Sequence, residues 1–182
     1  MTNDINLVDK NGQRIGSIDK LEAHRLGQLH EAFSVFIFNS KNELLLQQRN
    51  KEKYHSAGLW SNTVCSHPKF EEDLNQAVQR RLREEIGFIA PTKEIFSFIY
   101  KSDFENGLSE HEFDHVFIGY YDGSPIPDPQ EVMDYKWQTI PDLKEDLSKN
   151  PDNYTTWFRK IIEMDKLQKI TSLAKLSMNS II

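Results

Sequence analysis

Two short segments of the sequence place reactive side chains two residues apart. Cys65 and His67 form one pair, and Glu110 and Glu112 form the other, with Asp114 next in the same row. Side chains two residues apart share one face of a β-strand. Carboxylates on one face raise each other's pKa, and a bound cation is the usual way in which a protein relieves that repulsion. The pattern therefore indicates a metal site with carboxylate ligands.

Histidines form the second group of candidate ligands. His24 and His30 lie six residues apart ahead of an apolar run, and His67 follows Cys65. Imidazole and carboxylate ligands together suit Zn²⁺, Mn²⁺ or Fe²⁺. A histidine taken alone is more often structural or exposed than a ligand. The histidines interpreted in that ordinary way are His55, His111 and His115.

A predicted helix carries two charges on its apolar stripe. Residues 74–86 read as a helix that ends at a glycine. At about 100° per residue, Arg81 and Glu85 fall on the same face as Leu74 and Val78, directed at the body of the protein. The two charges are four residues apart and can form a salt bridge. This pair is either purely structural, or Arg81 also belongs to a site that binds phosphate. Other basic side chains that could contact phosphate are Arg49, Lys51, Lys53, Arg80 and Arg83.

The elements that would position these residues are both strands and helices. Residues 32–39 predict a strand buried on both faces, and the turn at Lys41 and Asn42 leads into a second strand at 43–49, so that the two form a hairpin. Other extended segments are expected at 60–66, 94–102, 112–121 and 132–140. Apolar residues spaced from 157 to 173 predict a long helix. The fold class is α+β, a sheet covered by helices.

Bulk properties exclude several classes of protein. The 182 residues suffice for one compact domain, expected to span 1–182. A net charge of −6 argues against a nucleic-acid partner but leaves room for a local basic pocket. We expect no signal peptide and no membrane span, since no apolar run is long enough. The single cysteine, Cys65, cannot form an intramolecular disulfide, which favours the cytoplasm, and a monomer is expected.

Several segments together resemble one known family. They are SNTVCSHP (61–68), RRLREEIG (80–87), SEHEFDHV (109–116), LHEAFSVFIFN (29–39), LLLQQR (44–49) and EVMDYKW (131–137). In this order they resemble type I isopentenyl-diphosphate isomerase, over about residues 5–165. The resemblance implies a Nudix-like mixed β-sheet sandwich flanked by helices. It also implies interconversion of isopentenyl and dimethylallyl diphosphate in isoprenoid biosynthesis, through protonation, a tertiary carbocation and deprotonation.

The resemblance assigns roles position by position. Ligands of a Mn²⁺ or Zn²⁺ ion would be His24, His30, His67, Glu110 and Glu112. A Mg²⁺ ion bound with the substrate diphosphate would contact Glu85. The groups at the reacting carbons would be Cys65 and Glu112 as the acid/base pair, Tyr100 near Glu112, and Trp157 facing the carbocation. The diphosphate would be held by Lys20, Arg49, Lys53 and Arg81.

The predicted helix at 74–86 and the residues just before it depart from the signature of Nudix hydrolases. That signature has the form G-x5-E-x7-R-E-U-x-E-E-x-G-U, and Arg81 stands where its second glutamate belongs. Ser66 replaces the first glycine, while the positions that are kept are Glu72, Arg80, Glu84, Glu85 and Gly87. A carboxylate of the hydrolytic set has thus become a cation. Hydrolysis of a nucleotide-linked diphosphate remains the first alternative function, and a metal-binding module without activity is the second.

Overall fold

The computed structural model describes residues 3–53, 55–104 and 106–163. Its strands are β1 (Asp4–Val8), β2 (Arg14–Asp19), β3 (His30–Phe38), β4 (Glu43–Arg49), β5 (Trp60–Ser61), β6 (Val64–Ser66), β7 (Thr92–Asp103), β8 (Ser109–Tyr120) and β9 (Val132–Thr139). Its α-helices are α1 (Lys20–Leu26), α2 (Leu74–Ile86), α3 (Ile140–Lys149) and α4 (Thr156–Ile161). A short 3₁₀ helix covers Pro151–Asn153.

Strand β3 lies at the centre of a mixed sheet. All nine of its residues are buried, as the sequence predicts. It pairs in parallel with β8 and antiparallel with β6. Alternate side chains pack into two separate cores: Phe36 and Phe38 into one, Phe33 and Val35 into the other. A parallel pair buried on both faces requires this continuous apolar run.

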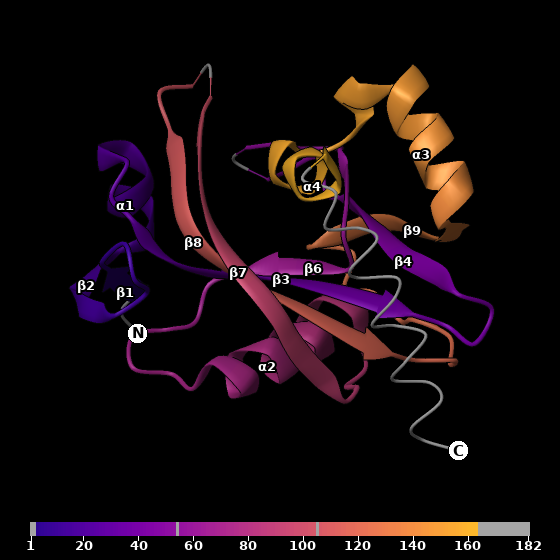
Figure 1. Cartoon of the computed structure of the whole chain (residues 1–182), viewed down its shortest axis with the longest axis horizontal. Coiled ribbons are helices and arrows are strands. Elements are labelled where there is room, and N and C mark those ends of the chain that lie inside the picture. Colours follow the sequence, from indigo (N-terminus) through magenta and orange to yellow (C-terminus); the bar gives the residue numbers. More distant parts are fainter. Residues whose placement is uncertain (1–2, 54, 105, 164–182) are drawn as a thin grey trace.

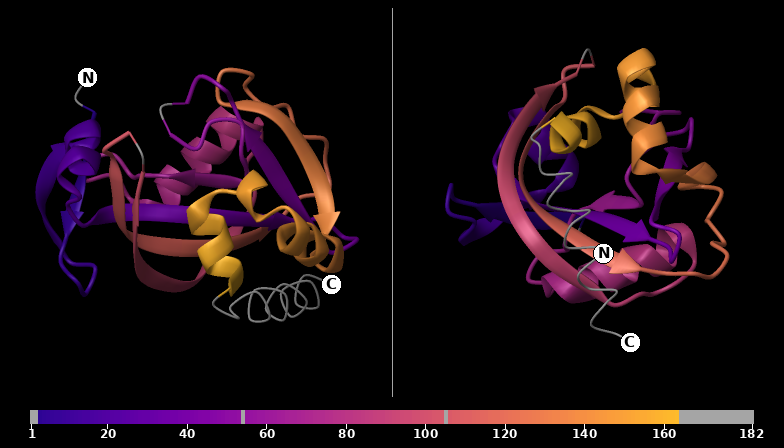
Figure 2. Two further views of the ribbon diagram at one scale, coloured as in Figure 1. Left: turned by 90° about the horizontal axis from the view of Figure 1, so that it is seen from above. Right: turned by 45° about the vertical axis from the view of Figure 1, so that its right-hand side comes forward.

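Helices cover both faces of the sheet, which confirms the α+β class. Figures 1 and 2 show α2 on one side of β3, with α3 and α4 on the other. Helix α2 has the bounds predicted for it and buries Val78 and Leu82 against one core. Its Asp73 side chain caps the first turn, and Gly87 ends it in the left-handed conformation with φ 84°. Any side chain on Gly87 would also collide with the backbone of Ile126.

The predicted hairpin of β3 and β4 is present but short. The turn exists, with Asn42 at φ 59°, but among the described residues β3 and β4 pair only at Phe38 and Leu44. Strand β4 instead pairs along its whole length with β9. The reason is that β8 and β6 already pair with β3, so β4 leaves β3 after the turn and pairs with β9.

One helical segment differs from the sequence prediction, and a second is described only in part. Ile140 begins α3 rather than ending β9; the Thr139 side chain caps this helix and Pro141 lies in its first turn. The predicted long helix corresponds, in the described part of the chain, to α4 (Thr156–Ile161), and its continuation through residue 173 falls outside the described residues. Within residues 3–53, 55–104 and 106–163, no helix has both the length and the apolar composition to span a bilayer.

Candidate active site

Four candidate metal ligands converge from four segments of the chain. His24 lies on α1, His30 begins β3, His67 follows β6 and Glu112 lies on β8, and their ligand atoms all lie within 4.8 Å of one another. The parallel pairing of β3 and β8 sets His30 opposite Glu112. The fifth predicted ligand, Glu110, shares the face of Glu112 two residues earlier on β8. The structure therefore brings the predicted ligands into one region, as the strand spacing requires.

The backbone contacts of two histidines select the tautomer that a metal needs. Nδ1 of His24 lies 2.6 Å from the carbonyl oxygen of Lys20, and Nδ1 of His30 lies 2.7 Å from that of Gln28. A carbonyl can only accept, so each Nδ1 carries the proton and each Nε2 carries a lone pair. The Nε2 atoms of His30 and His67 are 3.1 Å apart. This arrangement fits a divalent cation held between imidazole nitrogens.

The two glutamates of the site are driven to opposite ionisation states. Burial and the charge of Glu112 raise the pKa of Glu110 well above its usual range. Burial opposes ionisation of Glu112, but its close contacts with His30 and His67 hold its pKa well below the usual range. The hydroxyl of Tyr100 donates to Glu112 Oε2 at 2.7 Å and to Glu110 Oε2 at 3.1 Å. Tyr100 thus lies where the resemblance implies, in contact with both carboxyl groups.

Cys65 faces a buried polar pair. The Sγ atom lies 3.6 Å from Ser34 Oγ, and Ser34 Oγ donates to Asp114 Oδ2 at 2.8 Å. Burial, followed by the charges of Asp114 and Glu112, raises the pKa of the Cys65 thiol well above its usual range. Burial and Glu112 likewise raise the pKa of Asp114. The site therefore holds a protonated thiol and, at Glu112, an ionised carboxylate.

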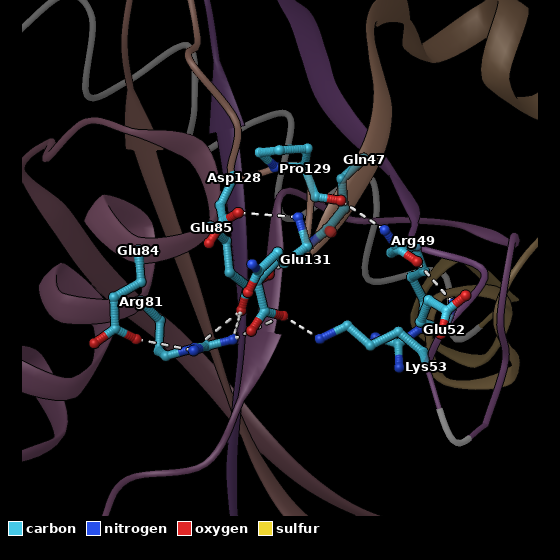
Figure 3. A network of polar contacts seen from close by, with 12 residues as sticks. Gln47, Arg49, Glu52, Lys53, Arg81, Glu84, Glu85, Asp128, Pro129 and Glu131 are labelled. Atoms are coloured by element: carbon cyan, nitrogen blue, oxygen red, sulfur yellow. Dashed lines mark hydrogen bonds and ion pairs between the residues drawn. The ribbon is translucent and has the colours of Figure 1, made fainter.

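Arg81 lies at the centre of a network of carboxylates (Figure 3). Its guanidinium donates to Glu85 Oε1 at 2.5 and 3.0 Å and to Glu84 Oε2 at 2.8 Å, and it approaches Glu131 Oε2 at 3.4 Å. Gln47 donates to the other oxygen of Glu85 at 2.9 Å. Although burial opposes it, the charges of Glu85 and Glu131 raise the pKa of Arg81. The predicted ion pair on α2 is confirmed.

Three further cations border the same region. Lys53 forms an ion pair with Glu131, which approaches Arg81 from the other side (Figure 3). The guanidinium of Arg49 donates to two carbonyl oxygens of the β4–β5 loop, at 3.2 and 3.3 Å. Burial and the nearby charge of Arg81 lower the pKa of Lys20. Glu131 therefore contacts two of the four cations that were predicted to hold the diphosphate.

Two neighbouring cavities connect these groups. The inner cavity, about 50 Å³, is lined by Lys20, Gln47, Arg49, Lys53, His55, Cys65, Ser66, His67, Arg81, Glu85, Glu110, Glu112, Glu131 and Trp157. The outer cavity, about 300 Å³, shares Lys20, Lys53, Ser66, His67, Arg81 and Glu131 with it and adds Lys69 and Arg80. Of the predicted site residues, His24, His30 and Tyr100 lie behind the inner cavity, in contact with its lining. All the others border it directly.

Trp157 belongs both to a core and to the cavity wall. The side chain is 1% exposed, and its Nε1 donates to Ser61 Oγ at 3.0 Å and to Asn62 Oδ1 at 3.2 Å. The guanidinium carbon of Arg49 lies 5.2 Å from the ring centroid. Both hydrogen bonds fix the indole plane beside the cavity. The position agrees with the role that the resemblance implies, which stays a prediction.

His55 and Glu131 are residues of the site that reasoning from the sequence missed. His55 was interpreted as an ordinary histidine, but its side chain is 7% exposed, lines the inner cavity and approaches Glu110 Oε1 at 3.5 Å. Burial and the charge of Arg49 lower the pKa of His55 to about 3, so the ring is neutral. His55 lies in a loop, where no periodic pattern could reveal its direction. The other two ordinary histidines, His111 and His115, contact Gly27 and Glu94 outside the cavity.

Comparisons with known proteins agree on the family. A family model described as the NUDIX domain matches residues 28–158. An isopentenyl-diphosphate Delta-isomerase 2 of Photorhabdus laumondii is 49% identical over 170 residues, which cover 93% of this chain and 96% of that protein. An isopentenyl-diphosphate Delta-isomerase 1 of Aromatoleum aromaticum is 48% identical over 163 residues, 90% of this chain and 92% of its own length.

Solved structures agree on the fold. A protein of Deinococcus radiodurans superimposes with a TM-score of 0.68 at 22% identity, covering 81% of this chain and 90% of its own. A MutT protein of Methanosarcina mazei Go1 does so with a TM-score of 0.63 at 21% identity, covering 78% and 95%. The chain therefore belongs to the NUDIX domain family and, within it, to the isopentenyl-diphosphate Delta-isomerases.

Proposed function

We propose that this protein interconverts isopentenyl diphosphate and dimethylallyl diphosphate, the isomerisation that serves isoprenoid biosynthesis. The observation that carries this proposal is one cavity that holds a thiol, an ionised carboxylate, an indole and four basic side chains. The names of the similar proteins from Photorhabdus laumondii and Aromatoleum aromaticum support the same reaction.

The two cavities suggest how the substrate lies. The outer cavity is lined by cations, among them Lys53 and Arg81, which suits a diphosphate group. The inner cavity adds Cys65, Glu112 and Trp157, which suits the short hydrocarbon chain. In this orientation the diphosphate anchors the substrate, and the alkene lies between the thiol and the carboxylate.

The reaction requires one proton donor and one proton acceptor. A proton is added to the terminal alkene carbon, which forms a new C–H bond and leaves a tertiary carbocation. A different proton then leaves the carbon on the other side of the cation, and the electrons of that C–H bond form the new double bond. Cys65 and Glu112 both border the inner cavity, so one can give a proton to the substrate and the other can take one from it.

The cationic intermediate needs stabilisation without a nucleophile. Water would trap it as an alcohol, so the cavity must exclude bulk solvent. The face of an indole stabilises a desolvated cation by about 2 kcal/mol without bonding to it. We propose this role for Trp157, whose plane is fixed by its two hydrogen bonds.

A divalent metal fits the histidine–glutamate cluster. We propose that the residues holding Mn²⁺ or Zn²⁺ are His24, His30, His67, Glu110 and Glu112. An ion bound there would fix the orientation of Glu112 and tune its acidity. Glu85 is proposed as the contact of a Mg²⁺ ion that arrives with the diphosphate, because this carboxylate lines the inner cavity.

Hydrolysis is disfavoured by the geometry of α2. Arg81 occupies the position of a signature glutamate, and its guanidinium donates to Glu84 and Glu85. A guanidinium there neutralises the remaining carboxylates that a hydrolase would need for its metal ions. We also keep a monomeric state and a cytoplasmic location as predictions, since the single cysteine suits a reducing compartment.

Proton NMR tests the proposed reaction directly. The purified protein would be incubated in D₂O with isopentenyl diphosphate, Mg²⁺ and Mn²⁺. We expect dimethylallyl diphosphate that contains deuterium, with no release of phosphate. A folded, metal-loaded sample that neither converts nor exchanges protons would refute the isomerase proposal, and phosphate release would favour the hydrolase.

A further inference from the structure

We propose that His55 is a further ligand of the metal ion in the histidine–glutamate cluster, supplied by the loop between β4 and β5. This inference rests on the proposed metal site and adds a ligand that neither the sequence motifs nor the strand spacing indicates. It requires that His55 point into the cluster, be held there, and present a ring nitrogen to the ion.

The position of His55 meets the first requirement. Its Nε2 lies 3.5 Å from Glu110 Oε1. His24, His55 and Glu110 form a second group whose ligand atoms lie within 4.8 Å of one another. His24 also belongs to the first group, with His30, His67 and Glu112. The two groups share His24 and are otherwise separate. Because ligand atoms lie about 2.1 Å from such an ion, His55 would reach the ion of the first group by a shift of its ring toward His24.

Aromatic neighbours hold the ring of His55 in place. The ring stacks on Phe104, with centroids 5.0 Å apart and planes inclined by 18°. The ring of Trp157 meets it edge-on at 6.0 Å and 86°. The side chain is only 7% exposed, although it belongs to a polar loop. Because the ring is already ordered, little conformational entropy would be lost when it binds a metal.

The second ring nitrogen of His55 has an oxygen partner on the next residue. Its Nδ1 lies 3.4 Å from Ser56 Oγ, which can accept a hydrogen bond from it. That tautomer puts the lone pair on Nε2, on the side of Glu110. His24 and His30 show the same division, with Nδ1 bound to an oxygen and Nε2 directed at the cluster.

The location of His55 in the chain links the metal to the substrate site. Lys53 precedes it by two residues and contacts Glu131 at the border of the diphosphate cavity. Ligation by His55 would fix this part of the β4–β5 loop and with it the position of Lys53. Because such coupling is reciprocal, binding of a diphosphate would in turn tighten metal binding.

Cobalt binding tests the inference without a measurement of activity. Apo-protein, its His55→Gln variant and a His111→Gln control would be titrated with Co²⁺, followed by the d–d absorption of the ion. We expect His55→Gln to weaken Co²⁺ binding by about tenfold or more. We also expect its absorption to intensify, because coordination number falls, and added inorganic pyrophosphate to tighten Co²⁺ binding less than in the wild type. His111→Gln should behave as the wild type does, since His111 contacts Gly27 outside the cavity.

Unchanged Co²⁺ affinity and spectrum in His55→Gln would overturn the inference. X-ray absorption of the Zn²⁺-loaded wild type gives a second test that needs no variant to fold. Four imidazole ligands per ion are expected, and three would contradict the role of His55. Absence of Co²⁺ and Zn²⁺ binding in the wild type would reject the proposed metal site as well, which separates the two failures.

Discussion

Replacing Arg81 with glutamine tests the electrostatics of the diphosphate site. The change removes a guanidinium that donates to Glu85 at 2.5 and 3.0 Å and keeps a polar side chain of moderate length. Glu85 is 5% exposed, and among the described residues the side-chain donor that it would retain is the neutral Gln47, at 2.9 Å. The variant therefore leaves a buried carboxylate without a cationic partner.

The expected loss follows from the burial of this ion pair. Removal of one partner from a buried pair costs about 3–5 kcal/mol, because the remaining charge is uncompensated. The side chain of Arg81 is 18% exposed, so solvent can relieve part of the penalty. We expect the metal-free variant to lose about 3 kcal/mol of unfolding free energy. Its KM for isopentenyl diphosphate should rise about ten- to hundredfold, because a charge-assisted hydrogen bond contributes about 1.5–3 kcal/mol.

Magnesium should reverse much of the loss of stability. In the wild type Arg81 and Mg²⁺ would compete for Glu85, whereas in the variant the carboxylate is available to the ion. Denaturant unfolding with and without excess Mg²⁺ measures this difference. We expect Mg²⁺ to stabilise the variant by at least about 1 kcal/mol more than it stabilises the wild type.

The neighbouring arginine provides a matched control. Arg80 lies on the same helix, is 23% exposed and pairs with Glu72 and Glu84. Arg80→Gln should lose about 1 kcal/mol or less, as partly exposed ion pairs do, and gain nothing extra from Mg²⁺. The reasoning fails if Arg81→Gln is as stable as the wild type, or if Mg²⁺ stabilises all three proteins equally.

Other changes address the reacting groups. Cys65→Ala should lower turnover by about 10²–10⁴-fold in the NMR assay with an unchanged melting profile, and near-normal turnover would remove Cys65 from the mechanism. Trp157→Phe should lower kcat more than it changes KM, and a pure KM effect would argue against contact with the carbocation. Because the folded-state pKa of Asp114 is raised, its ionisation destabilises the fold as pH rises above the usual aspartate range. Asp114→Asn should therefore be more stable than the wild type at pH 7 but not at pH 3, and equal pH slopes in urea unfolding would refute this. The same variant should speed alkylation of Cys65 by iodoacetamide, and an unchanged alkylation rate would argue against coupling of the two groups.

Periodic elements of the fold could be predicted from the sequence. The burial of β3 and the bounds of α2 followed from apolar spacing, and so did the shared face of Glu110 and Glu112. The pairing of β4 with β9 could not be predicted, because its register depends on which edges of β3 are already occupied. The start of α3 at Ile140 was missed because Ile140 is β-branched and apolar, as strand residues often are, although Thr139 and Pro141 mark the start of a helix.

Some residues of the site could likewise be predicted from the sequence, and others could not. Spacing indicated a carboxylate–imidazole cluster, and resemblance supplied the particular residues, but neither indicated His55 or Glu131. Both lie outside regular elements, and their directions are set by contacts with distant residues such as Phe104 and Arg81. A loop side chain of this kind becomes visible only when the whole chain has folded.

The parallel alignment of His30 with Glu112 also has a consequence for how the chain matures. A slip of one residue between β3 and β8 would turn one of the two ligands to the opposite face of the sheet. Only the correct alignment presents both side chains to the same ion. Metal binding would therefore distinguish correctly folded molecules from misfolded ones. Molecules with misaligned central strands would not bind the ion and would lack the stabilisation that it brings. Such molecules would be more susceptible to proteolysis.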